Sequence, residues 1–486
     1  MKQLKKLLRE ITPTEVVGDV SRNIAALHYD SRAVEGGDMF FAVTGEVVDG
    51  HDYISGAIQR GATAVVCQRV PDTIVDEVCY ICVEDSSQAM GRIASAFYGN
   101  PSRELKVVGV TGTNGKTTTA TLLHDLFVKL GYKVGLISTV EYKIAGETIE
   151  STHTTPDSIR LAEMMRRMVD CGCEYCFMEV SSHAIAQHRI EGLEFDGAIF
   201  TNITHDHLDY HKTFSEYIKV KKGLFDSLDK GAFALTNIDD RNGRVMVQNC
   251  DAEIVSYSLR SMANFKAKVV EIHFDGMLLR IDGEELWVKF IGRFNAYNLL
   301  AAYATATMLG IDKREVLVAL SSLHSVSGRF EYITAPNGTT IIVDYAHTPD
   351  ALENVLTTIQ EIRGANQDLY VVCGCGGGRD REKRPVMASI AMKYASTAIF
   401  TSDNPRNENP EDILSDMVAG VDKGCSGARY LRITNRVEAI RAAVMMSKAG
   451  DIILIAGKGH ETYQIIGENK FHFDDREVAR EAMNQL

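Results

Sequence analysis

The sequence has no long uninterrupted hydrophobic run, and this absence excludes a helix that crosses a bilayer. Residues 1–9 are basic, but no apolar segment follows them, so we expect a short amphipathic helix there instead of a signal peptide. Short-period repeats and low-complexity tracts are also missing. These absences predict a soluble globular protein of the cytoplasm.

The chain also lacks an excess of basic residues. It contains 52 Lys and Arg against 65 Asp and Glu, a formal net charge of -13. A nucleic-acid partner requires a basic face, so we expect none. Anionic ligands must instead be met by local Arg and Lys, by helix N-termini or by metal ions. At 486 residues the chain is too long for one hydrophobic core, and two to four domains are expected.

Ten cysteines include two C-x-x-C pairs, Cys79 with Cys82 and Cys173 with Cys176. Such pairs can hold a structural zinc ion. Here the pairs are far apart in sequence and lie in or beside segments that resemble buried strands. We therefore favour free, buried thiols in a reducing compartment over a zinc site.

The stretch Val107–Thr119 organises the rest of the chain. It begins as an apolar strand, turns through Gly112 and Gly115, and opens a helix at Lys116. One face of that helix repeats at the spacing of a buried surface, through Leu123, Leu126, Phe127 and Leu130. A glycine-rich turn before a helix N-terminus forms a phosphate cradle, because backbone N–H groups and the helix dipole both favour an anion.

Two features decide how specific this signal is. The standard P-loop pattern requires a glycine five residues before Gly115, and that position is Val110. Gly-Lys-Thr at a strand–helix junction is nevertheless typical of nucleotide sites, with Lys116 reaching the outer phosphates and the Thr117 hydroxyl holding magnesium. We favour nucleotide binding over a plain tight turn.

Apolar strands that alternate with helices predict an α/β protein with mostly parallel sheets. A Gly-Asn-Pro-Ser cluster near residue 100 indicates a boundary, and we predict units at 1–102, 103–330 and 331–486. The predicted strands are Met39–Val43, Ala64–Cys67, Val134–Ile137, Phe177–Val180, Ala198–Thr201, Ala232–Thr236, Thr340–Val343, Leu369–Cys373, Ala398–Thr401 and Ile452–Ile455.

Polar residues gather directly after these strands, where open α/β sheets bind ligands. Glu179 ends one strand and His207 follows the next, so the two could hold a divalent cation. The alternative for a lone histidine is a structural role; the density of Asp and His in 205–211 favours function.

Three other segments leave their alternatives open. Lys219, Lys221 and Lys222 lie in a predicted helix and by themselves suggest a solvated face. Gly374–Gly378 and the basic residues after it could cradle an anion or form a flexible turn. Asp403–Arg406 could be only a turn, since Asn-Pro favours one.

Taken together, these motifs resemble the Mur ligases, the amide-forming enzymes of peptidoglycan precursor synthesis. The resemblance covers essentially the whole chain. Its motifs occur in the family's order: Thr111–Thr118, Glu179–His183, Gln187–Arg189, Asp206–His211, Gly292–Asn298, Asp344–Pro349, Gly374–Arg379, Asp403–Arg406 and Gly457–Glu461.

The resemblance implies three domains: a UDP-substrate-binding domain, a central P-loop ATPase-type domain and a Rossmann-like C-terminal domain that binds an amino acid. Asp403–Arg406 is similar to the tetrapeptide of members that add meso-2,6-diaminopimelate to the D-Glu γ-carboxylate of UDP-MurNAc-L-Ala-D-Glu. The implied enzyme is a cytoplasmic, monomeric ligase that uses ATP and Mg²⁺ and serves cell-wall biogenesis, cell shape and cell division. The alternatives are an L-lysine-adding ligase and, from another class, a P-loop regulatory ATPase.

The resemblance also implies roles for individual residues. The UDP-substrate would contact Tyr29, Ser31, Glu46, Val47, Val48, Thr154, Thr155, Ser181, Gln187 and Arg189. ATP would contact Gly112, Thr113, Asn114, Gly115, Lys116, Thr117, Thr118, Asn295 and Asp344.

Metal and amino-acid ligands are implied in the same way. The metal would be held by Thr117, Glu179, His207 and Lys221, the last as a carbamate, which turns an ammonium into an anionic oxygen ligand. Catalysis would fall to Lys116, Glu179, His207 and Lys221. Diaminopimelate would contact Arg379, Asp403, Asn404, Pro405, Arg406, Gly457 and Glu461.

Overall fold

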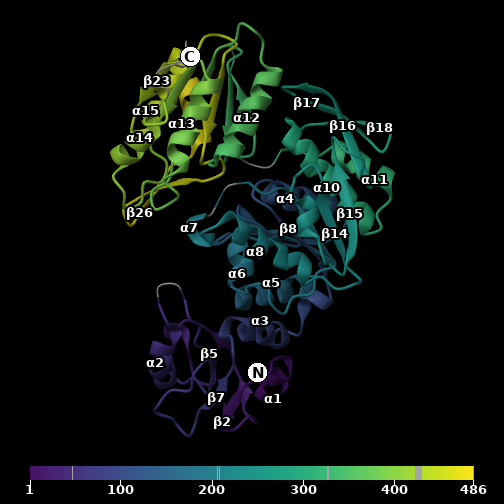
Figure 1. The fold of residues 1–486 in the computed structure, drawn as a ribbon, viewed down its shortest axis with the longest axis vertical. Coiled ribbons are helices and arrows are strands. Elements are labelled where there is room, and N and C mark those ends of the chain that lie inside the picture. Colours follow the sequence, from purple (N-terminus) through teal and green to yellow (C-terminus); the bar gives the residue numbers. More distant parts are fainter. Residues whose placement is uncertain are drawn as a thin grey trace.

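A computed structural model describes residues 1–45, 48–204, 206, 208–325, 328–335, 337–421 and 429–484. Three α/β units follow one another along the long axis, with the N-terminal unit at one end and the C-terminal unit at the other (Figure 1). None of the helices in these ranges is long and apolar enough to cross a membrane.

The N-terminal unit contains a five-stranded sheet in the order β2-β7-β6-β5-β4. Its strands are Glu15–Val17, Cys79–Cys82, Ala64–Cys67, Met39–Phe41 and Leu27–His28. Helices α2 and α3 span Ile54–Gln59 and Ser86–Phe97. The amphipathic helix expected at the start is short: α1 covers only Leu4–Leu7, and both leucines are buried.

The central unit is built on an eleven-stranded sheet in the order β11-β10-β9-β12-β8-β13-β14-β15-β16-β17-β18. Strands β8, β9 and β12–β15 are Lys106–Thr111, Val134–Ile137, Tyr175–Glu179, Gly197–Phe200, Phe233–Asn237 and Glu253–Ser258, and they run parallel. The outer strands β10, β11 and β16–β18 (Glu141–Ile144, Glu147–Glu150, Phe265–His273, Gly276–Ile281, Glu284–Val288) add antiparallel pairs that the sequence did not predict.

Helices cover both faces of the central sheet because alternate residues of its strands point to opposite sides. Val108 of β8 packs with α4 (Lys116–Lys129), α10 (Arg293–Met308) and α11 (Lys313–Ser321). Val107 packs on the other face with α5 (Ser158–Asp170) and α8 (Phe214–Asp226). Short helices α6, α7 and α9 are Ser182–Ala186, Leu208–His211 and Gly243–Met246.

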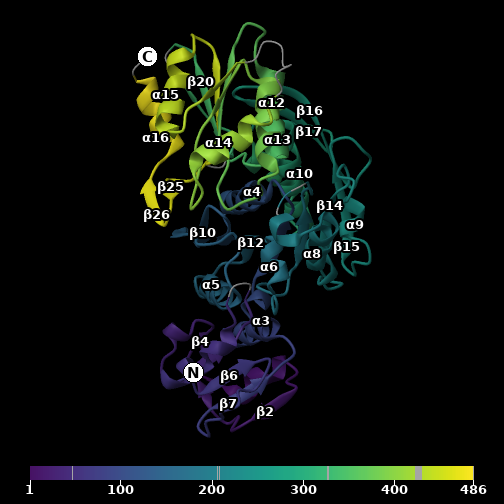
Figure 2. The same ribbon diagram turned by 60° about the vertical axis from the view of Figure 1, so that its left-hand side comes forward.

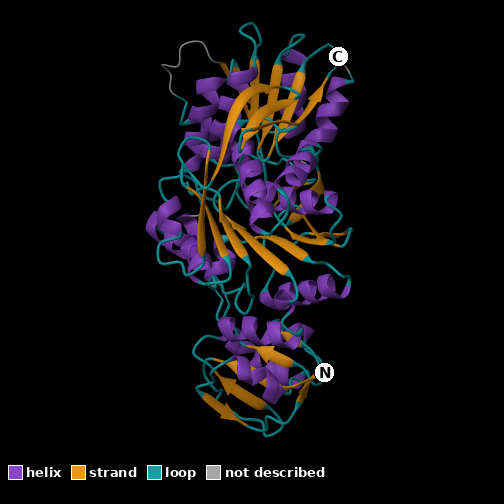
Figure 3. Cartoon of the chain, turned by 90° about the vertical axis from the view of Figure 1, so that its right-hand side faces the viewer, coloured by secondary structure: helices purple, strands orange, loops and turns teal. Residues whose placement is uncertain are grey.

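The C-terminal unit has a six-stranded sheet in the order β19-β20-β24-β21-β22-β23, parallel except for β19. The strands are Glu331–Thr334, Thr340–Asp344, Ile452–Ala456, Leu369–Cys373, Thr397–Phe400 and Arg429–Arg432. Helices flank this sheet on both sides (Figure 3): α12 (Pro349–Ile362), α13 (Lys383–Tyr394), α14 (Pro410–Val418), α15 (Arg436–Met446) and α16 (Asp475–Met483).

A hairpin leaves this unit near its C-terminus. It consists of β25 and β26, Tyr463–Ile466 and Asn469–His472. Figure 2 shows the hairpin pointing from the C-terminal unit toward the central unit. The hairpin forms backbone hydrogen bonds with the segment after β22: Arg406 donates its N–H to the Ile465 carbonyl, and the Arg406 carbonyl accepts from the Gly467 N–H.

Candidate active site

Loops at the carboxyl ends of strands from the central and C-terminal units line one cavity of about 560 Å³. The central unit contributes the turn after β8, the end of β12 and Lys221 of α8. The C-terminal unit contributes the turns after β21, β22 and β24. Two units meet here, so the cavity is a place where two ligands can be brought together.

The glycines of the phosphate loop are required by close packing. Gly112 has a φ of 149°, and a Cβ there would lie 1.9 Å from the Thr201 hydroxyl oxygen. Gly115 has a φ of 87°, and its Cβ would lie 2.6 Å from Asn298 Oδ1. Both positions combine a left-handed φ with no space for a side chain.

Two of the backbone N–H groups that we expected to favour an anion are instead paired within the protein. Thr113 donates its N–H to the Asn202 carbonyl at 2.8 Å, and Asn114 donates to Asn202 Oδ1 at 2.9 Å. The first N–H groups of α4 have no intrahelical acceptor. The donors that remain for an anion in this turn are therefore the N–H groups at the helix N-terminus.

Two lysines, the partly buried Lys116 and the buried Lys221, share one acceptor beside this loop. Lys116 donates its Nζ to the Gly112 and Thr113 carbonyls, at 3.0 and 2.8 Å. Lys221 also donates to the Gly112 carbonyl, at 2.8 Å. The prediction of a solvated face is wrong for Lys221, whose exposure is 1%. It holds for Lys219, whose side chain is 79% exposed.

Burial controls the charge on both amines. It lowers the pKa of Lys116, although Glu179 and Asp206 act in the opposite direction. Burial lowers the pKa of Lys221 well below its ordinary value, and the positive charge of Lys116 lowers it further. When the pKa of a lysine is lowered, a larger fraction of its amine is neutral and nucleophilic near neutral pH.

Glu179 is fully buried at the end of β12. One carboxylate oxygen accepts from the Thr139 N–H at 2.7 Å and the other accepts from its hydroxyl at 3.1 Å. Together with Thr117 Oγ1, it offers the oxygen donors that magnesium prefers. The predicted ligand His207 lies outside the described residues, within which no group of three His, Cys, Asp or Glu could hold a metal.

The residues predicted for the peptide end of the UDP-substrate lie together around Thr155. Its hydroxyl donates to the Glu179 carbonyl at 2.8 Å and accepts from the Ser181 N–H at 3.2 Å. Arg189 donates to the Thr155 carbonyl at 2.7 Å and to Gln187 Oε1 at 2.6 Å. The hydroxyl of Thr154, next to Thr155, is 3.0 Å from that of Thr139. Thr154, Thr155, Ser181 and Arg189 line the same cavity as the phosphate loop.

The residues predicted for the UDP end lie in the N-terminal unit. Tyr29 is 49% exposed, and burial and the charge of Asp157 raise its pKa, against the effect of Arg189. Ser31 begins a 3-10 turn, Ser31–Ala33, and Val48 is exposed. Glu46 and Val47 lie outside the described residues.

A second cavity of about 930 Å³ shares Asn114 and Gly115 with the first and also includes Thr118. Asp344 also lines it; burial raises the pKa of its carboxyl, which accepts from the N–H groups of Phe330 and Ala346. Asn295 does not line this cavity. Its side chain bonds to the Ile291 carbonyl and to Asn298.

Arg329 joins the two cavities, and the sequence reasoning did not identify it. Its guanidinium donates to Thr117 Oγ1 at 3.1 Å and lies 4.5 Å from the centre of the Tyr345 ring. Its Nε is buried without a hydrogen-bond partner among the described residues. An arginine that reaches the phosphate loop from the segment just before β19 can sense or neutralise phosphate charge. Gly-Arg alone is too common a dipeptide to signal this.

The residues predicted for the amino acid form a second polar cluster. Lys458 is fully buried, and its Nζ lies 3.0 Å from both Asn404 Oδ1 and Glu461 Oε2 and 3.6 Å from Asp403 Oδ1. Asn404 Nδ2 also donates to Glu461 Oε2. Burial raises the pKa of Glu461, against the effect of Lys458. Sequence reasoning missed Lys458, although its motif was noted.

Arg406 and Arg379 complete the cluster, and both line the cavity. Arg406 adopts a left-handed φ of 52°, and its Nη1 donates to the Gly377 carbonyl at 2.9 Å. Gly457 must be glycine, because a Cβ there would lie 2.7 Å from Asp403 Oδ2. The cluster presents both signs of charge, as an amino-acid substrate requires.

Comparison with known families agrees with this architecture. The profile named "Mur ligase middle domain" matches residues 110–306, "Mur ligase, glutamate ligase domain" matches 328–459, and "Mur ligase family, catalytic domain" matches 23–98. The chain belongs to the Mur ligase family, whose members form amide bonds at the expense of ATP.

Individual relatives narrow the comparison. A UDP-N-acetylmuramoyl-L-alanyl-D-glutamate--2,6-diaminopimelate ligase of Phocaeicola vulgatus is 54% identical over 479 residues, covering 99% of each chain. A solved structure with the same enzyme name is 32% identical, covers 98% of each chain and has a TM-score of 0.71. The MurF ligase of Thermotoga maritima, solved with ADP, shares the fold at 19% identity, with a TM-score of 0.62 and coverage of 95% of this chain and 97% of that one.

Proposed function

We propose that this chain is an ATP-dependent ligase that joins meso-2,6-diaminopimelate to the D-Glu γ-carboxylate of UDP-MurNAc-L-Ala-D-Glu. The observation that carries the proposal is the cavity that lies between the phosphate loop and the polar cluster of Asp403, Asn404, Arg406 and Glu461. Its lining includes the residues proposed for the phosphate groups, for the substrate carboxylate and for the amino acid. The names of full-length relatives at about 54% identity support the substrate assignment.

The chemistry requires activation, because a carboxylate is a poor electrophile. Transfer of the γ-phosphoryl group of ATP to the substrate carboxylate gives an acyl phosphate and ADP. Attack by the amino-acid amine then forms the amide and releases phosphate. Lys116 and the N-terminus of α4 stabilise the negative charge on the transferring group. Arg329 adds a further cation beside Thr117.

The C-terminal unit supplies the amine and excludes water from the acyl phosphate. Its Glu461 and Asp403 face the substrate ammonium group, while Arg379 and Arg406 face carboxylates. Asn404, Pro405 and Gly457 shape the turn that holds them. The distal carboxylate, which lysine lacks, pairs with the planar fork of Arg406.

Lys221 is proposed to carry a carbamate. Carbamate formation needs a neutral amine to attack CO₂, and the lowered pKa of Lys221 favours that form. With Thr117, Glu179 and His207, the carbamate oxygens would hold magnesium, which supplies charge neutralisation at the phosphate groups when bound. These oxygen and nitrogen donors suit the ion.

The remaining assignments are part of the same proposal. Tyr29, Ser31 and the loop at 46–48 hold the uridine diphosphate end, and Thr154, Thr155, Ser181, Gln187 and Arg189 hold the peptide end. ATP contacts residues 112–118, with Asp344 near the ribose and Asn295 near the adenine, behind Asn298. The enzyme acts as a cytoplasmic monomer in cell-wall synthesis and thereby in cell shape and division. Domain limits at 102/103 and 330/331 belong to the proposal too.

Phosphate release tests the proposal when each substrate is omitted in turn. The account expects release only with ATP, UDP-MurNAc-L-Ala-D-Glu and diaminopimelate together. Turnover of ATP that needs neither of the other substrates would instead favour the rival, a P-loop regulatory ATPase.

A further inference from the structure

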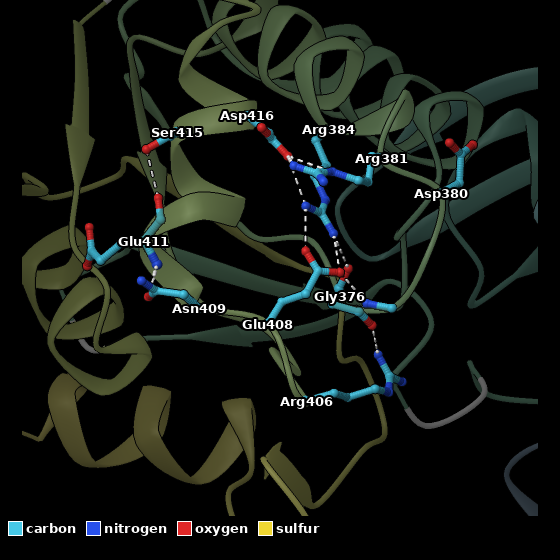
Figure 4. Close-up of polar contacts among 12 residues, drawn as sticks. Gly376, Asp380, Arg381, Arg384, Arg406, Glu408, Asn409, Glu411, Ser415 and Asp416 are labelled. Atoms are coloured by element: carbon cyan, nitrogen blue, oxygen red, sulfur yellow. Dashed lines mark hydrogen bonds and ion pairs between the residues drawn. The ribbon is translucent and has the colours of Figure 1, made fainter.

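The glycine-rich turn after β21 is held by a buried ion-pair network. Arg384 of α13 is fully buried, and its guanidinium pairs with Glu408 at 3.0 Å and with Asp416 of α14 at 2.9 Å (Figure 4). Its Nη2 also donates to the Gly376 carbonyl at 3.4 Å. A fully buried guanidinium is costly unless all its partners stay in place, so this network fixes their positions.

Glu408 connects the network to the other end of the same turn. Its carboxylate accepts from the Gly378 N–H, while it pairs with Arg384. Hydrogen bonds from Arg384 and from Gly378 lower the pKa of Glu408, so the carboxylate is charged at neutral pH. Gly376 is therefore hydrogen-bonded to Arg384 and Gly378 to Glu408, the two members of one ion pair, and Gly377 lies between the two glycines.

Gly377 in turn contacts the segment that carries Arg406. Its N–H donates to the Asn404 carbonyl at 2.9 Å, and its carbonyl accepts from Arg406 Nη1 at 2.9 Å. A Cβ on Gly377 would lie 1.9 Å from the Pro405 carbonyl oxygen, so the two turns are in direct contact. The direction of the Arg406 guanidinium thus depends on where Arg384 and Glu408 hold the glycines.

We propose that Arg384 and Glu408 are positioning residues for amino-acid selection, acting through the Gly376–Gly378 turn on Arg406. The inference rests on the proposed function, in which Arg406 pairs with the distal carboxylate. Neither residue lines the cavity, so neither is expected to touch substrate. Their effect is to keep the guanidinium of Arg406 aimed at one place.

The test uses Arg384→Lys, which keeps the charge but replaces the planar guanidinium, whose two terminal nitrogens reach separate acceptors, with a single ammonium nitrogen. We expect the KM for diaminopimelate to rise about 10- to 100-fold, since a displacement of about 1 Å can cost that much. The KM values for ATP and the UDP-substrate should stay within about twofold. In the proposed function these two substrates contact the central and N-terminal units, and not the Gly376–Gly378 turn. Glu408→Gln keeps an acceptor for Gly378 and should give a smaller rise of the same kind.

Arg381→Ala is the matched control. Arg381 pairs with the same Asp416 at 3.0 Å, but its side chain is 67% exposed and makes no described bond to the glycine turn. We expect it to leave every KM unchanged. A double-mutant cycle adds the decisive readout: Arg384→Lys should have no further effect on diaminopimelate use once Arg406→Ala is present.

The outcomes separate the inference from the proposed function. Wild-type enzyme that does not use diaminopimelate refutes the proposed function, and this inference falls with it. With wild-type activity intact, multiplicative effects of Arg384→Lys and Arg406→Ala, or equal rises in the KM of all three substrates, overturn the inference alone. If Arg384→Lys does not fold, Glu408→Gln decides the same question, and an unchanged KM for diaminopimelate there contradicts the inference.

Discussion

Two glycine-rich turns meet in the active-site cavity, and they work by different means. The turn at Gly112–Gly115 leads straight into α4, so in the proposed function its anion-binding donors come from the helix backbone and Lys116. The turn at Gly374–Gly378 is separated from α13, and it is contacted by the side chains of Arg384, Arg406 and Glu408. Backbone donors suit a phosphate group that many substrates share. Side chains suit one particular amino acid.

The comparison predicts that changes at the Gly112–Gly115 turn lower the reaction rate with every amino acid, whereas changes at the Gly374–Gly378 turn alter which amino acid is used. Both turns are contacted by arginine or lysine side chains from elsewhere in the fold. Arg329 and Lys221 reach the first turn, and Arg384 reaches the second.

Lys221→Ala should have the largest effect. Loss of the carbamate would remove a metal ligand, and we expect a rate loss of about 10³-fold, by analogy with the removal of one electrostatic stabiliser. Added formate or acetate should restore part of the rate. Lys219→Ala, two residues away and exposed, is the control and should be normal. A fully active Lys221→Ala enzyme would contradict the assignment.

Lys116→Ala should reduce the rate about 100-fold or more, because a cation that acts on the transferring phosphoryl group is lost. The loss should be the same with any accepted amino acid. The melting temperature checks that the fold is intact, and Lys129→Ala on the exposed end of the same helix serves as the control. Near-normal turnover would reject the phosphate-loop assignment.

Arg406→Ala should raise the KM for diaminopimelate about thirtyfold. The guanidinium is only partly buried, which places its loss at the lower end of about 2 to 5 kcal/mol for a charge-assisted pair. ATP and UDP-substrate binding should change little in steady-state assays. An unchanged KM for diaminopimelate would show that another residue recognises the distal carboxylate.

Alanine at matched glycines should separate the two turns with smaller effects. Gly112→Ala clashes with Thr201 and should raise the KM for ATP about tenfold, while Gly377→Ala clashes with Pro405 and should raise that for diaminopimelate about tenfold. Gly146→Ala, with a φ of 94° and open space, controls for backbone strain alone, roughly 1–2 kcal/mol. If Gly112→Ala and Gly377→Ala each raised the KM for ATP and the KM for diaminopimelate equally, the two turns would not have separate roles.

The sequence predicted the strands well where apolar residues run together. Val134–Ile137 and Leu369–Cys373 have the predicted bounds, and Phe177–Val180 is shifted to Tyr175–Glu179. Among the missed antiparallel strands, β16 alternates buried and exposed residues over its first half, so it has no continuous apolar run of the kind that marked the predicted strands.

The site was harder to predict, because its contacts join distant segments. Lys221 stands among charged neighbours, and only tertiary packing of α8 buries it. Arg329 contacts Thr117, which lies 212 positions away in the sequence, and Lys458 contacts Asn404, which lies 54 positions away. Arg384 of α13 pairs with Asp416 of α14. No periodicity in a single sequence identifies such pairs.

The ratio of kcat/KM for meso-diaminopimelate to that for L-lysine, measured on the wild-type enzyme with saturating ATP and UDP-MurNAc-L-Ala-D-Glu, tests the central claim most directly. A cation aimed at the distal carboxylate predicts a preference for diaminopimelate of at least about thirtyfold, from a charge-assisted pair worth about 2 kcal/mol or more. Equal use of the two amino acids, or a preference for lysine, would contradict it.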